Sequence, residues 1–289
     1  MQITEHVFSK KMEFTANTPF GLLKRHAFVF LVKGTEKNCL IDAATKPLLP
    51  EVLDFMAETG LRPSDIGEIL ITHSHSDHTG ALKSLKELCG CPVAASKGSV
   101  EWIENIDLQF EKRPVPRFYE FVEGSVKVDH QLVPGDVISL GDGSLKAYAA
   151  PGHDQGQLVY FHPEDGVLLS ADSIPVPGSM PVYDNVQAQL DTLYRLRDIP
   201  GVKVLLMSWD DPHYGEEEVR QVLDDAIAYV RHIHCLTMEA VGSLGADDVE
   251  AVAKQVHSAL NLAPSEFTKM FITTIKAHME AKEVSNAIF

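Results

Sequence analysis

The sequence predicts an α/β protein that begins with a strand-rich domain and ends in helices. Short apolar runs bounded by glycine, proline or aspartate dominate the first two-thirds of the chain, as strands do. Beyond Gly215 the apolar residues recur at spacings of three and four, the period of an amphipathic helix. The 289 residues suit one large α/β domain with a small appendage. We therefore expect a domain over residues 1–215 and a helical extension over residues 216–289 that packs on it.

A hairpin, a helix and a buried strand are the first elements that the sequence predicts. Apolar runs at 26–32 and 39–41 flank a turn-forming segment, so the hairpin ends at Asp42. Residues 50–59 follow with helical apolar spacing, a proline at the start and a glycine after the end. Ile69–Ile71 is short and apolar throughout, as a strand buried on both faces is.

The rest of the chain supplies further strands and then the helical tail. Residues 79–88 have the apolar spacing of a helix. Further strands are expected at residues 145–149, 158–161, 167–169 and 202–207. In the tail, helical spacing continues to about Lys282, and helix starts are indicated by Asp247 or Asp248 and by Pro264-Ser265. We expect about three short helices in this region.

The composition restricts the partners and the location of the protein. A formal net charge of −16 repels a phosphate backbone, because nucleic-acid affinity comes largely from lysine and arginine. The amino-terminal residues lack the apolar core of a signal peptide, and no stretch approaches the roughly 18 apolar residues of a membrane span. Four cysteines fit a reducing compartment. We therefore expect a cytoplasmic protein with neither a nucleic-acid nor a membrane partner.

The stretch His73-Ser-His75-Ser-Asp77-His78 contains four potential metal ligands in six positions. On an extended chain that leaves a strand, residues two apart point the same way, so His73 and His75 can bind one ion. A turn into the following helix would direct Asp77 and His78 toward a second ion. Mixed imidazole and carboxylate ligands suit zinc, iron or manganese better than magnesium or calcium. We therefore expect two divalent transition-metal ions, with zinc as the first choice and iron or manganese as alternatives.

Two further candidate ligands follow predicted strands. His153 stands in the sequence Pro151-Gly-His153, after the strand at 145–149, and Asp172 stands after the strand at 167–169. Both positions are strand ends, which is where residues that complete the centre are required.

These residues resemble the motifs of the metallo-β-lactamase superfamily, and within it the glyoxalase II type. The resemblance runs in order from about residue 25 to residue 215. It implies a four-layer αβ/βα sandwich, the metallo-β-lactamase fold, with a small C-terminal helical extension. It also implies that residues 1–215 form a metal-binding catalytic domain.

The resemblance assigns the candidate residues to two metals. The first set is His73, His75 and His153, and the second is Asp77, His78 and a last histidine. By the same resemblance Asp172 bridges both metals, and Asp42 supports the site without binding metal.

The last histidine is the point at which this sequence departs from the family. The family commonly has Gly-His-Gly after a strand, whereas this chain has Ser208-Trp-Asp-Asp-Pro-His213-Tyr-Gly215. His213 follows Asp172 at a spacing similar to that of the family, so we expect it to be the last ligand. The alternatives are Asp210 or Asp211 in its place, or a site that holds one metal.

The resemblance implies a hydrolase in which a dinuclear site activates water. Such a site lowers the pKa of water toward neutrality and polarises a carbonyl group, and Asp77 can accept or relay a proton. The carboxylate of Asp172 in the bridging position is unlike the thiolate of antibiotic-cleaving enzymes and more like glyoxalase II. We therefore expect a small-molecule ester, thioester or lactone as the substrate.

Two other functions are compatible with the same residues. One is an iron-dependent oxidoreductase of the persulfide dioxygenase type, and the other is a non-catalytic regulatory protein on the same fold. The sequence does not decide the oligomeric state, and a homodimer is one alternative.

Residues 97–134 form a long insertion rich in aromatic residues and proline between the second and third motifs. Long loops beside an active site often set specificity, so the insertion is either a cover over the site or an additional helix and hairpin.

Overall fold

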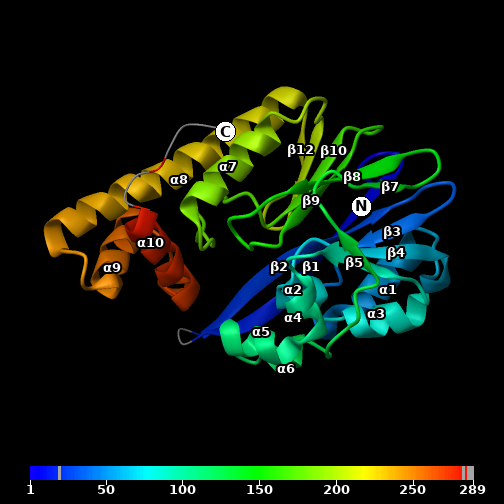
Figure 1. The fold of residues 1–289 in the computed structure, drawn as a ribbon, viewed down its shortest axis with the longest axis horizontal. Coiled ribbons are helices and arrows are strands. Elements are labelled where there is room, and N and C mark those ends of the chain that lie inside the picture. The colour runs from blue at the N-terminus through cyan, green and yellow to red at the C-terminus, as the bar shows by residue number, and fades with distance from the viewer. Residues whose placement is uncertain (19–20, 282–283, 285–289) are drawn as a thin grey trace.

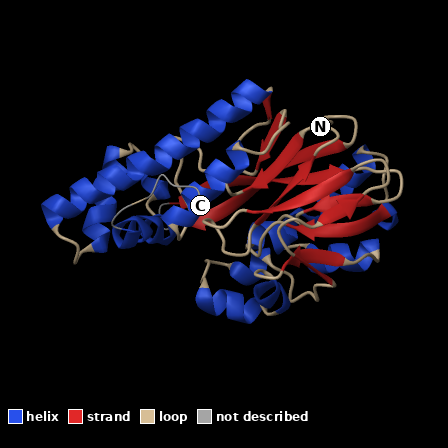
Figure 2. Ribbon diagram, turned by 45° about the horizontal axis from the view of Figure 1, so that its top comes forward, coloured by secondary structure: helices blue, strands red, loops and turns tan. Residues whose placement is uncertain are grey.

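Two six-stranded β-sheets pack face to face, and helices cover the outer face of each sheet (Figures 1 and 2). The structure is a computed structural model and describes residues 1–18, 21–281 and 284. The four layers, in the order helix, sheet, sheet and helix, confirm the fold class that the sequence predicts.

The first sheet follows the order of the sequence. Its strands are β1 (Val7–Thr18), β2 (Gly21–Val32), β3 (Asn38–Ile41), β4 (Ile66–Ile71), β5 (Val93–Ser96) and β6 (His130–Leu132). The pairs β1–β2 and β2–β3 are antiparallel, whereas β3 to β6 run parallel. The carboxyl ends of β3 and β4 therefore meet at one edge of the sheet.

The second sheet has the strand order β12-β11-β10-β9-β8-β7. Its strands are β7 (Val137–Ser139), β8 (Ser144–Ala149), β9 (Leu158–His162), β10 (Val167–Ala171), β11 (Val204–Met207) and β12 (His213–Tyr214). Only β10 and β11 run parallel among these pairs, since the others are antiparallel.

The helices divide into two groups, one for each sheet (Figure 1). The group beside the first sheet is α1 (Leu49–Glu58), α2 (Ser76–Thr79), α3 (Leu82–Cys89), α4 (Val100–Glu104), α5 (Ile106–Lys112) and α6 (Phe118–Phe121). The group beside the second sheet and beyond it is α7 (Val186–Arg197), α8 (Glu216–Leu244), α9 (Val249–Ala259) and α10 (Lys269–Ala281).

Apolar side chains fill the three spaces between the four layers. In β4, Leu70 lies in the cluster between the two sheets, whereas Ile69 and Ile71 lie in the cluster that also holds residues of α1 and α3. In β10, Leu169 faces the other sheet and Leu168 lies in the cluster with α7. Alternate residues of a strand point to opposite faces, so these central strands are apolar throughout, as predicted for Ile69–Ile71.

Most of the predicted elements are present. The predicted hairpin is β2 paired with β3, with Phe30 opposite Ile41. The predicted helix at 50–59 is α1, and the remaining predicted strands are β4, β8, β9, β10 and β11. The helix expected at 79–88 starts later, because α2 ends at Thr79 and α3 begins at Leu82.

The sequence does not predict β1 or α7. β1 is an edge strand in which Met12 is buried while Lys11 and Glu13 are exposed, and such charges are typical of edges. In α7 two of the buried side chains, Gln189 and Thr192, are polar, which weakens the apolar period. The buried face of β1 therefore has little apolar pattern, whereas α7 still buries Val186, Leu190, Leu193 and Leu196 at helical spacing, a signal from which it could have been predicted.

The C-terminal helices differ from the prediction in length. α8 spans 29 residues, so the tail does not consist of short helices alone. Asp248 caps α9 by accepting a hydrogen bond from Ala251 N at 2.9 Å, whereas Pro264 begins a short 3₁₀ turn, η3 (Pro264–Glu266). Lys282, the predicted end of the helical spacing, lies outside the described residues.

α8 belongs to two apolar clusters. Leu223 and Val230 in its first half pack with α7 and the second sheet. Ile233 and Ala240 in its second half pack with α9 and α10 around Phe271. Because one helix joins both clusters, the division at residue 215 stays a prediction.

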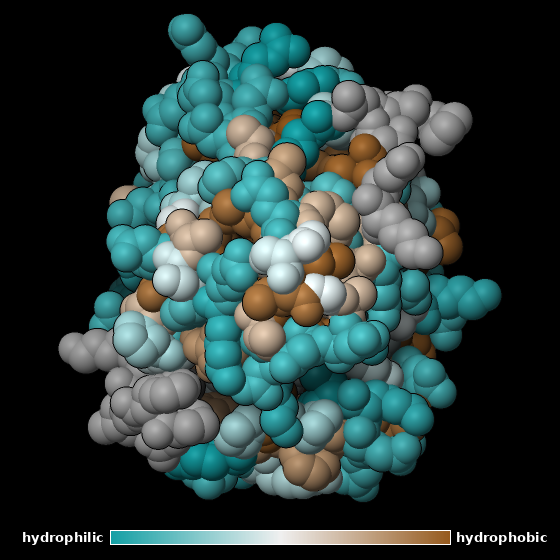
Figure 3. All heavy atoms as spheres, turned by 90° about the vertical axis from the view of Figure 1, so that its left-hand side faces the viewer, coloured by the Kyte–Doolittle hydropathy of each residue, from teal (hydrophilic) through white to brown (hydrophobic). Residues whose placement is uncertain are grey.

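None of the helices in the described part of the chain is a candidate membrane span. No helix there combines the length and the apolar character that crossing a bilayer requires. Figure 3 shows the molecule from the side that lies at the left in Figure 1, where α9 and α10 are found, and hydrophilic side chains interrupt the apolar ones on this face.

Gly80 gives a test of the packing between α2, α6 and the 3₁₀ turn η1 (Lys46–Leu48) that precedes α1. A Cβ atom at Gly80 would meet only backbone, namely Phe121 O, Thr45 Cα at 2.6 Å and Lys46 N at 2.7 Å. We expect Gly80→Ala to lower the free energy of unfolding by about 1–3 kcal/mol, as overpacking does. The matched control is Gly242→Ala in α8. A Cβ atom at Gly242 would meet no heavy atom within 4 Å outside its own helix, so the free energy of unfolding should rise by up to about 1 kcal/mol. Denaturant unfolding measures both, and equal effects would contradict the packing.

Candidate metal centre

The candidate ligands come together where strands of the two sheets end. Asp42 follows β3 and His73 follows β4, whose parallel ends share an edge. Asp172 follows β10 of the second sheet, and His153 lies in the loop between β8 and β9. The side chains of these residues are all buried.

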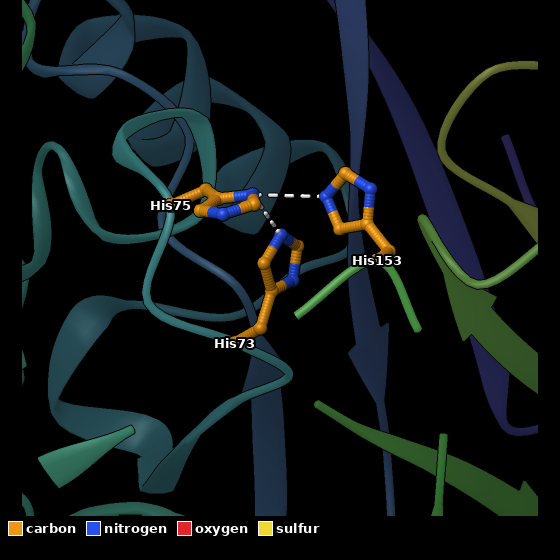
Figure 4. A group of neighbouring side chains, drawn as sticks. All are labelled: His73, His75 and His153. Carbon is orange, nitrogen blue, oxygen red and sulfur yellow. Dashed lines mark hydrogen bonds between the residues drawn. The ribbon is translucent and has the colours of Figure 1, made fainter. Parts of the chain in front are cut away.

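Three histidines form one group of converging nitrogen atoms. His75 Nδ1 lies 2.9 Å from His73 Nε2 and 2.9 Å from His153 Nε2. Figure 4 shows the three rings directed toward one another, His73 and His75 from one segment and His153 from a distant part of the chain. Burial is the main cause that holds the pKa of both His73 and His75 well below its ordinary value. Neutral imidazoles of this kind keep the lone pairs that a metal ion requires.

A second group consists of His73, His78 and Asp172, and in each group the potential ligand atoms lie within 4.8 Å of one another. Asp172 faces both groups, because its Oδ1 lies 3.2 Å from His78 Nε2 and its Oδ2 lies 3.4 Å from His153 Nε2. A carboxylate with one oxygen toward each group is suited to bridge two cations.

The carboxylates around His78 determine the charge of the second ligand group. Burial acts to lower the pKa of His78, but Asp172, Asp42 and Asp77 outweigh it and raise this pKa well above its ordinary value. Burial acts to raise the pKa of Asp172, yet the neighbouring histidines hold it well below its usual range. The surroundings thus attract positive charge to this point, where protons and metal ions compete.

Two buried atoms of this centre lack a hydrogen-bond partner among the described residues. They are His78 Nε2 and Asp172 Oδ1, which face each other at 3.2 Å without forming a hydrogen bond. Unpaired buried polar atoms are costly and rare, and a cation between them would satisfy both. The residues present therefore fit a metal ion.

Supporting contacts fix the orientation of the histidine rings. His78 Nδ1 lies 2.8 Å from Asp42 Oδ2, and His153 Nδ1 lies 2.7 Å from Val182 O. His73 Nδ1 lies 3.1 Å from Thr72 Oγ1, which itself donates to Asp42. In each of these rings the Nδ1 side is occupied and Nε2 is left for the centre, as is usual for metal-binding histidines.

Comparison with known proteins agrees with this geometry. Residues 23–233 match the family model of the metallo-β-lactamase superfamily. The chain belongs to this superfamily. The predicted family is therefore confirmed, and the matched range extends beyond residue 215 into α8.

Relatives of the chain within the superfamily include two with named activities. A hydroxyacylglutathione hydrolase of Rhodobacter capsulatus is 28% identical over 62% of this chain and 59% of its own length. The acyl-coenzyme A thioesterase MBLAC2 of Gallus gallus is 30% identical over 60% of this chain and 67% of its own length. The chain thus spans about three-fifths to two-thirds of these relatives, whose names support the prediction of an enzyme.

A solved structure shares the superfamily fold over almost the whole chain. A metallo-β-lactamase family protein from Thermus thermophilus superimposes with a TM-score of 0.71 at 20% identity, covering 95% of this chain and 93% of the other.

Asp77 lies at the rim of the candidate centre and belongs to neither of the two ligand groups. Its Oδ2 is 3.8 Å from His78 Nε2, and the side chain is 18% exposed. It is close enough to both Arg25 and Arg113 to influence the pKa of each guanidinium. Asp77 is therefore placed to meet both a group bound at the centre and the solvent.

The structure does not bring His213 to this centre. Its Nε2 lies 3.2 Å from Asp210 Oδ2 and its Nδ1 lies 3.0 Å from Glu218 Oε1, so both ring nitrogens face other carboxylates. Neither described ligand group contains it, and neither contains Asp210 or Asp211.

The register of β12 explains this position. The chain reverses after β11, so that His213 pairs with Leu205, and Leu205 pairs with Leu168. Leu168 of β10 precedes Asp172, which follows this strand, by four residues, a separation of roughly 13 Å along an extended chain. The turn after β11 thus carries His213 back along the sheet, away from the edge where the ligands lie.

Several residues near the centre were not predicted. Asp154, directly after His153, has its Oδ2 3.7 Å from His75 Nε2. Gln109 in the 97–134 insertion donates from Nε2 to Ser74 O at 2.6 Å, inside the histidine motif. The insertion forms α4, α5, α6 and β6, and this contact attaches it to the site.

The C-terminal helices support the loop that orients His153. Tyr183 follows Val182, its N–H donates to Thr274 Oγ1 at 3.1 Å, and its hydroxyl lies 2.8 Å from His278 Nε2. Burial, aided by the neighbouring His234, lowers the pKa of His278 to about 3. Buried polar groups of α8 and α10 are therefore linked to a candidate ligand.

This depressed pKa predicts a pH effect on stability. Below about pH 6.5 the unfolded chain binds a proton at His278 that the folded protein does not bind, so this residue costs about 1.4 kcal/mol of stability per pH unit. Between pH 6.5 and 5 the wild type should lose about 2 kcal/mol relative to His278→Asn. Denaturant unfolding at both pH values measures the difference.

The control for this effect is His232→Asn, which changes an exposed histidine of α8. Its stability should follow that of the wild type across the same pH range. Parallel pH profiles for the wild type and His278→Asn would contradict a buried neutral imidazole at this position.

Proposed function

We propose that the protein is a metal-dependent hydrolase that uses two divalent transition-metal ions to attack small-molecule thioesters, esters or lactones with water. The observation that carries this proposal is the pair of buried ligand groups, each with one member within 3.4 Å of an oxygen atom of Asp172. Membership of the superfamily supports it.

The proposed ligands form two sets joined by Asp172. The first set is His73, His75 and His153, and the second is His78 with Asp77 from the rim. Zinc is the first choice because imidazole and carboxylate ligands suit it, with iron or manganese as alternatives. With His213 left out, the second set has one protein ligand fewer than predicted, which leaves positions for water or substrate.

The chemistry divides between the ions and the chain. When bound, two such ions polarise a carbonyl group and bring the pKa of water toward neutrality. Asp42 and Val182 O hold His78 and His153 in the orientation that presents Nε2 to the centre. Asp77, partly exposed beside His78, is placed to accept the proton that the attacking water loses.

A thioester is the first substrate class. Two relatives bear the names hydroxyacylglutathione hydrolase and acyl-coenzyme A thioesterase, which supports this choice over a lactone or an oxygen ester. The cytoplasmic location, the homodimer and the domain division at residue 215 stay predictions of the sequence.

The metal content of the protein tests the ligand assignment. After loading with zinc and dialysis, the wild type should hold about two equivalents, and Asp172→Asn should hold about one or fewer because a bridging carboxylate serves both ions. Asp54→Asn, an exposed change on α1, should leave the content unchanged. Elemental analysis measures all three. A loaded wild type with less than one equivalent would contradict the centre.

The activity of Asp77→Asn tests the proposed proton acceptor. At saturating zinc we expect kcat for an acyl thioester to fall by about 10²–10⁴-fold, the usual effect of removing a general base. Asp54→Asn again serves as the control. Full activity in Asp77→Asn would remove this residue from the mechanism, and a screen with lactones and phosphodiesters would show whether the substrate class is correct.

A further inference from the structure

Arg113 carries a positive charge to the edge of the candidate centre without an acidic side chain in contact with it. It follows α5, and its backbone N–H donates to Gln109 O at 2.8 Å. Its Nη2 lies 3.4 Å from Met270 Sδ, a weak acceptor. Within the described part of the chain no ion pair to Arg113 is found, so most of its five N–H donors remain available.

The helix that precedes Arg113, α5, is attached to the histidine motif. Gln109, one helical turn before Arg113, is buried and donates to Ser74 O, between His73 and His75. The hydrogen bond from Arg113 N–H to Gln109 O places the backbone of Arg113 one turn beyond this anchored side chain. On its other side Arg113 meets Met270 of α10. The residue is thus held between the 97–134 insertion and the C-terminal helices.

The guanidinium of Arg113 is close enough to acidic residues of the candidate centre for charge–charge interaction. Four carboxylates, those of Asp77, Asp154, Asp172 and Asp184, act on the guanidinium. Burial lowers the pKa of Arg113, but a guanidinium remains protonated at neutral pH.

A half-buried cation without a direct partner is costly. The nearby carboxylates offset part of this cost by their longer-range attraction. In the proposed enzyme, Asp77 and Asp172 are committed to divalent ions, so this attraction decreases. An anionic group on the substrate would supply the missing partner, and the planar fork of arginine matches a carboxylate with two hydrogen bonds.

We propose that Arg113 is a specificity-determining residue that binds a carboxylate of the substrate, so that the enzyme prefers acyl thioesters bearing this anionic group near the scissile bond. The proposal rests on the hydrolase function proposed above and names its substrate class. It also assigns the 97–134 insertion a role as a cover that sets specificity.

Three thioesters of similar size separate the effect of the anion from that of the thioester. The pentanoyl and glutaryl thioesters of N-acetylcysteamine differ only in a terminal carboxylate on the acyl side. The pentanoyl thioester of 3-mercaptopropionate carries the carboxylate on the thiol side. A preference for the second or the third compound over the first supports the proposal and shows on which side of the scissile bond Arg113 acts.

The variants are Arg113→Gln and, as a matched control, Lys112→Gln, which changes the exposed neighbouring cation paired with Glu111. In Arg113→Gln we expect kcat/KM for the preferred anionic thioester to fall by about 10- to 100-fold, the value of charge-assisted hydrogen bonds, mainly through KM. The neutral thioester should lose much less, within about threefold, because it lacks the carboxylate that Arg113 would bind. All three substrates should be unaffected in Lys112→Gln.

A binding measurement separates this proposal from the hydrolase function itself. The thioether in which a methylene replaces the scissile carbonyl of the preferred anionic substrate cannot be hydrolysed. Calorimetry should show that zinc-loaded wild type binds this thioether about tenfold or more tightly than Arg113→Gln does, with partial recovery in Arg113→Lys.

The outcomes are distinct. Binding that depends on Arg113 without turnover of any thioester would leave this inference standing and remove the hydrolase function. If the wild type hydrolyses all three thioesters and Arg113→Gln does so at unchanged rates, the hydrolase function stands and the role of Arg113 is overturned. Equal losses on the neutral and anionic substrates, or no binding of the anionic thioether by the wild type, would overturn the role of Arg113 in specificity.

Discussion

The buried carboxylate of Asp42 is the contact on which the arrangement of the centre depends. Its Oδ1 accepts a hydrogen bond from Thr72 N at 2.8 Å, and its Oδ2 lies 2.8 Å from both Thr72 Oγ1 and His78 Nδ1. One side chain thereby joins the end of β3 to the end of β4 and to α2. Asp42 has a φ of 64°, in the left-handed region that non-glycine residues seldom occupy, and these hydrogen bonds to a charged group offset the strain.

Further contacts around Asp42 and beyond it hold the other candidate ligands in place. Thr72 Oγ1 donates to Asp42 and also contacts His73 Nδ1, which orients that ring. The carbonyl oxygen of Val182, in the loop before α7, orients His153 through its Nδ1. The insertion contacts the histidine motif through Gln109, and the C-terminal helices contact the loop that orients His153 through Tyr183. Segments on opposite sides of the molecule therefore converge on a few ligand atoms, which limits how far those atoms can move apart.

The sequence predicts best what local geometry decides. His73, His75 and His78 follow a buried apolar strand at fixed spacing, so their convergence needs little more than the strand and the turn. His153 and Asp172 follow strands that are themselves recognisable, and here the family resemblance supplied the pairing. The fold class is accessible in the same way, because central strands buried on both faces are apolar throughout.

What the sequence does not predict depends on register and on distant contacts. Counting residues after Asp172 cannot show that the chain reverses after β11 and carries His213 back beside Leu205. Arg113 and Gln109 lie in an insertion whose position on the sheet is set by a contact with Ser74, 35 residues away. The edge strand β1 remains hidden because its charges are suited to solvent rather than to a core.

The length of α8 has a consequence for how the molecule is held together. Its first half is part of the layer on the second sheet, and its second half is the support for α9 and α10. No flexible linker therefore separates the two apolar clusters, because an unbroken helix backbone runs through both. Because opening one cluster would disturb the helix that the other packs on, we expect these helices to unfold together with the sheets.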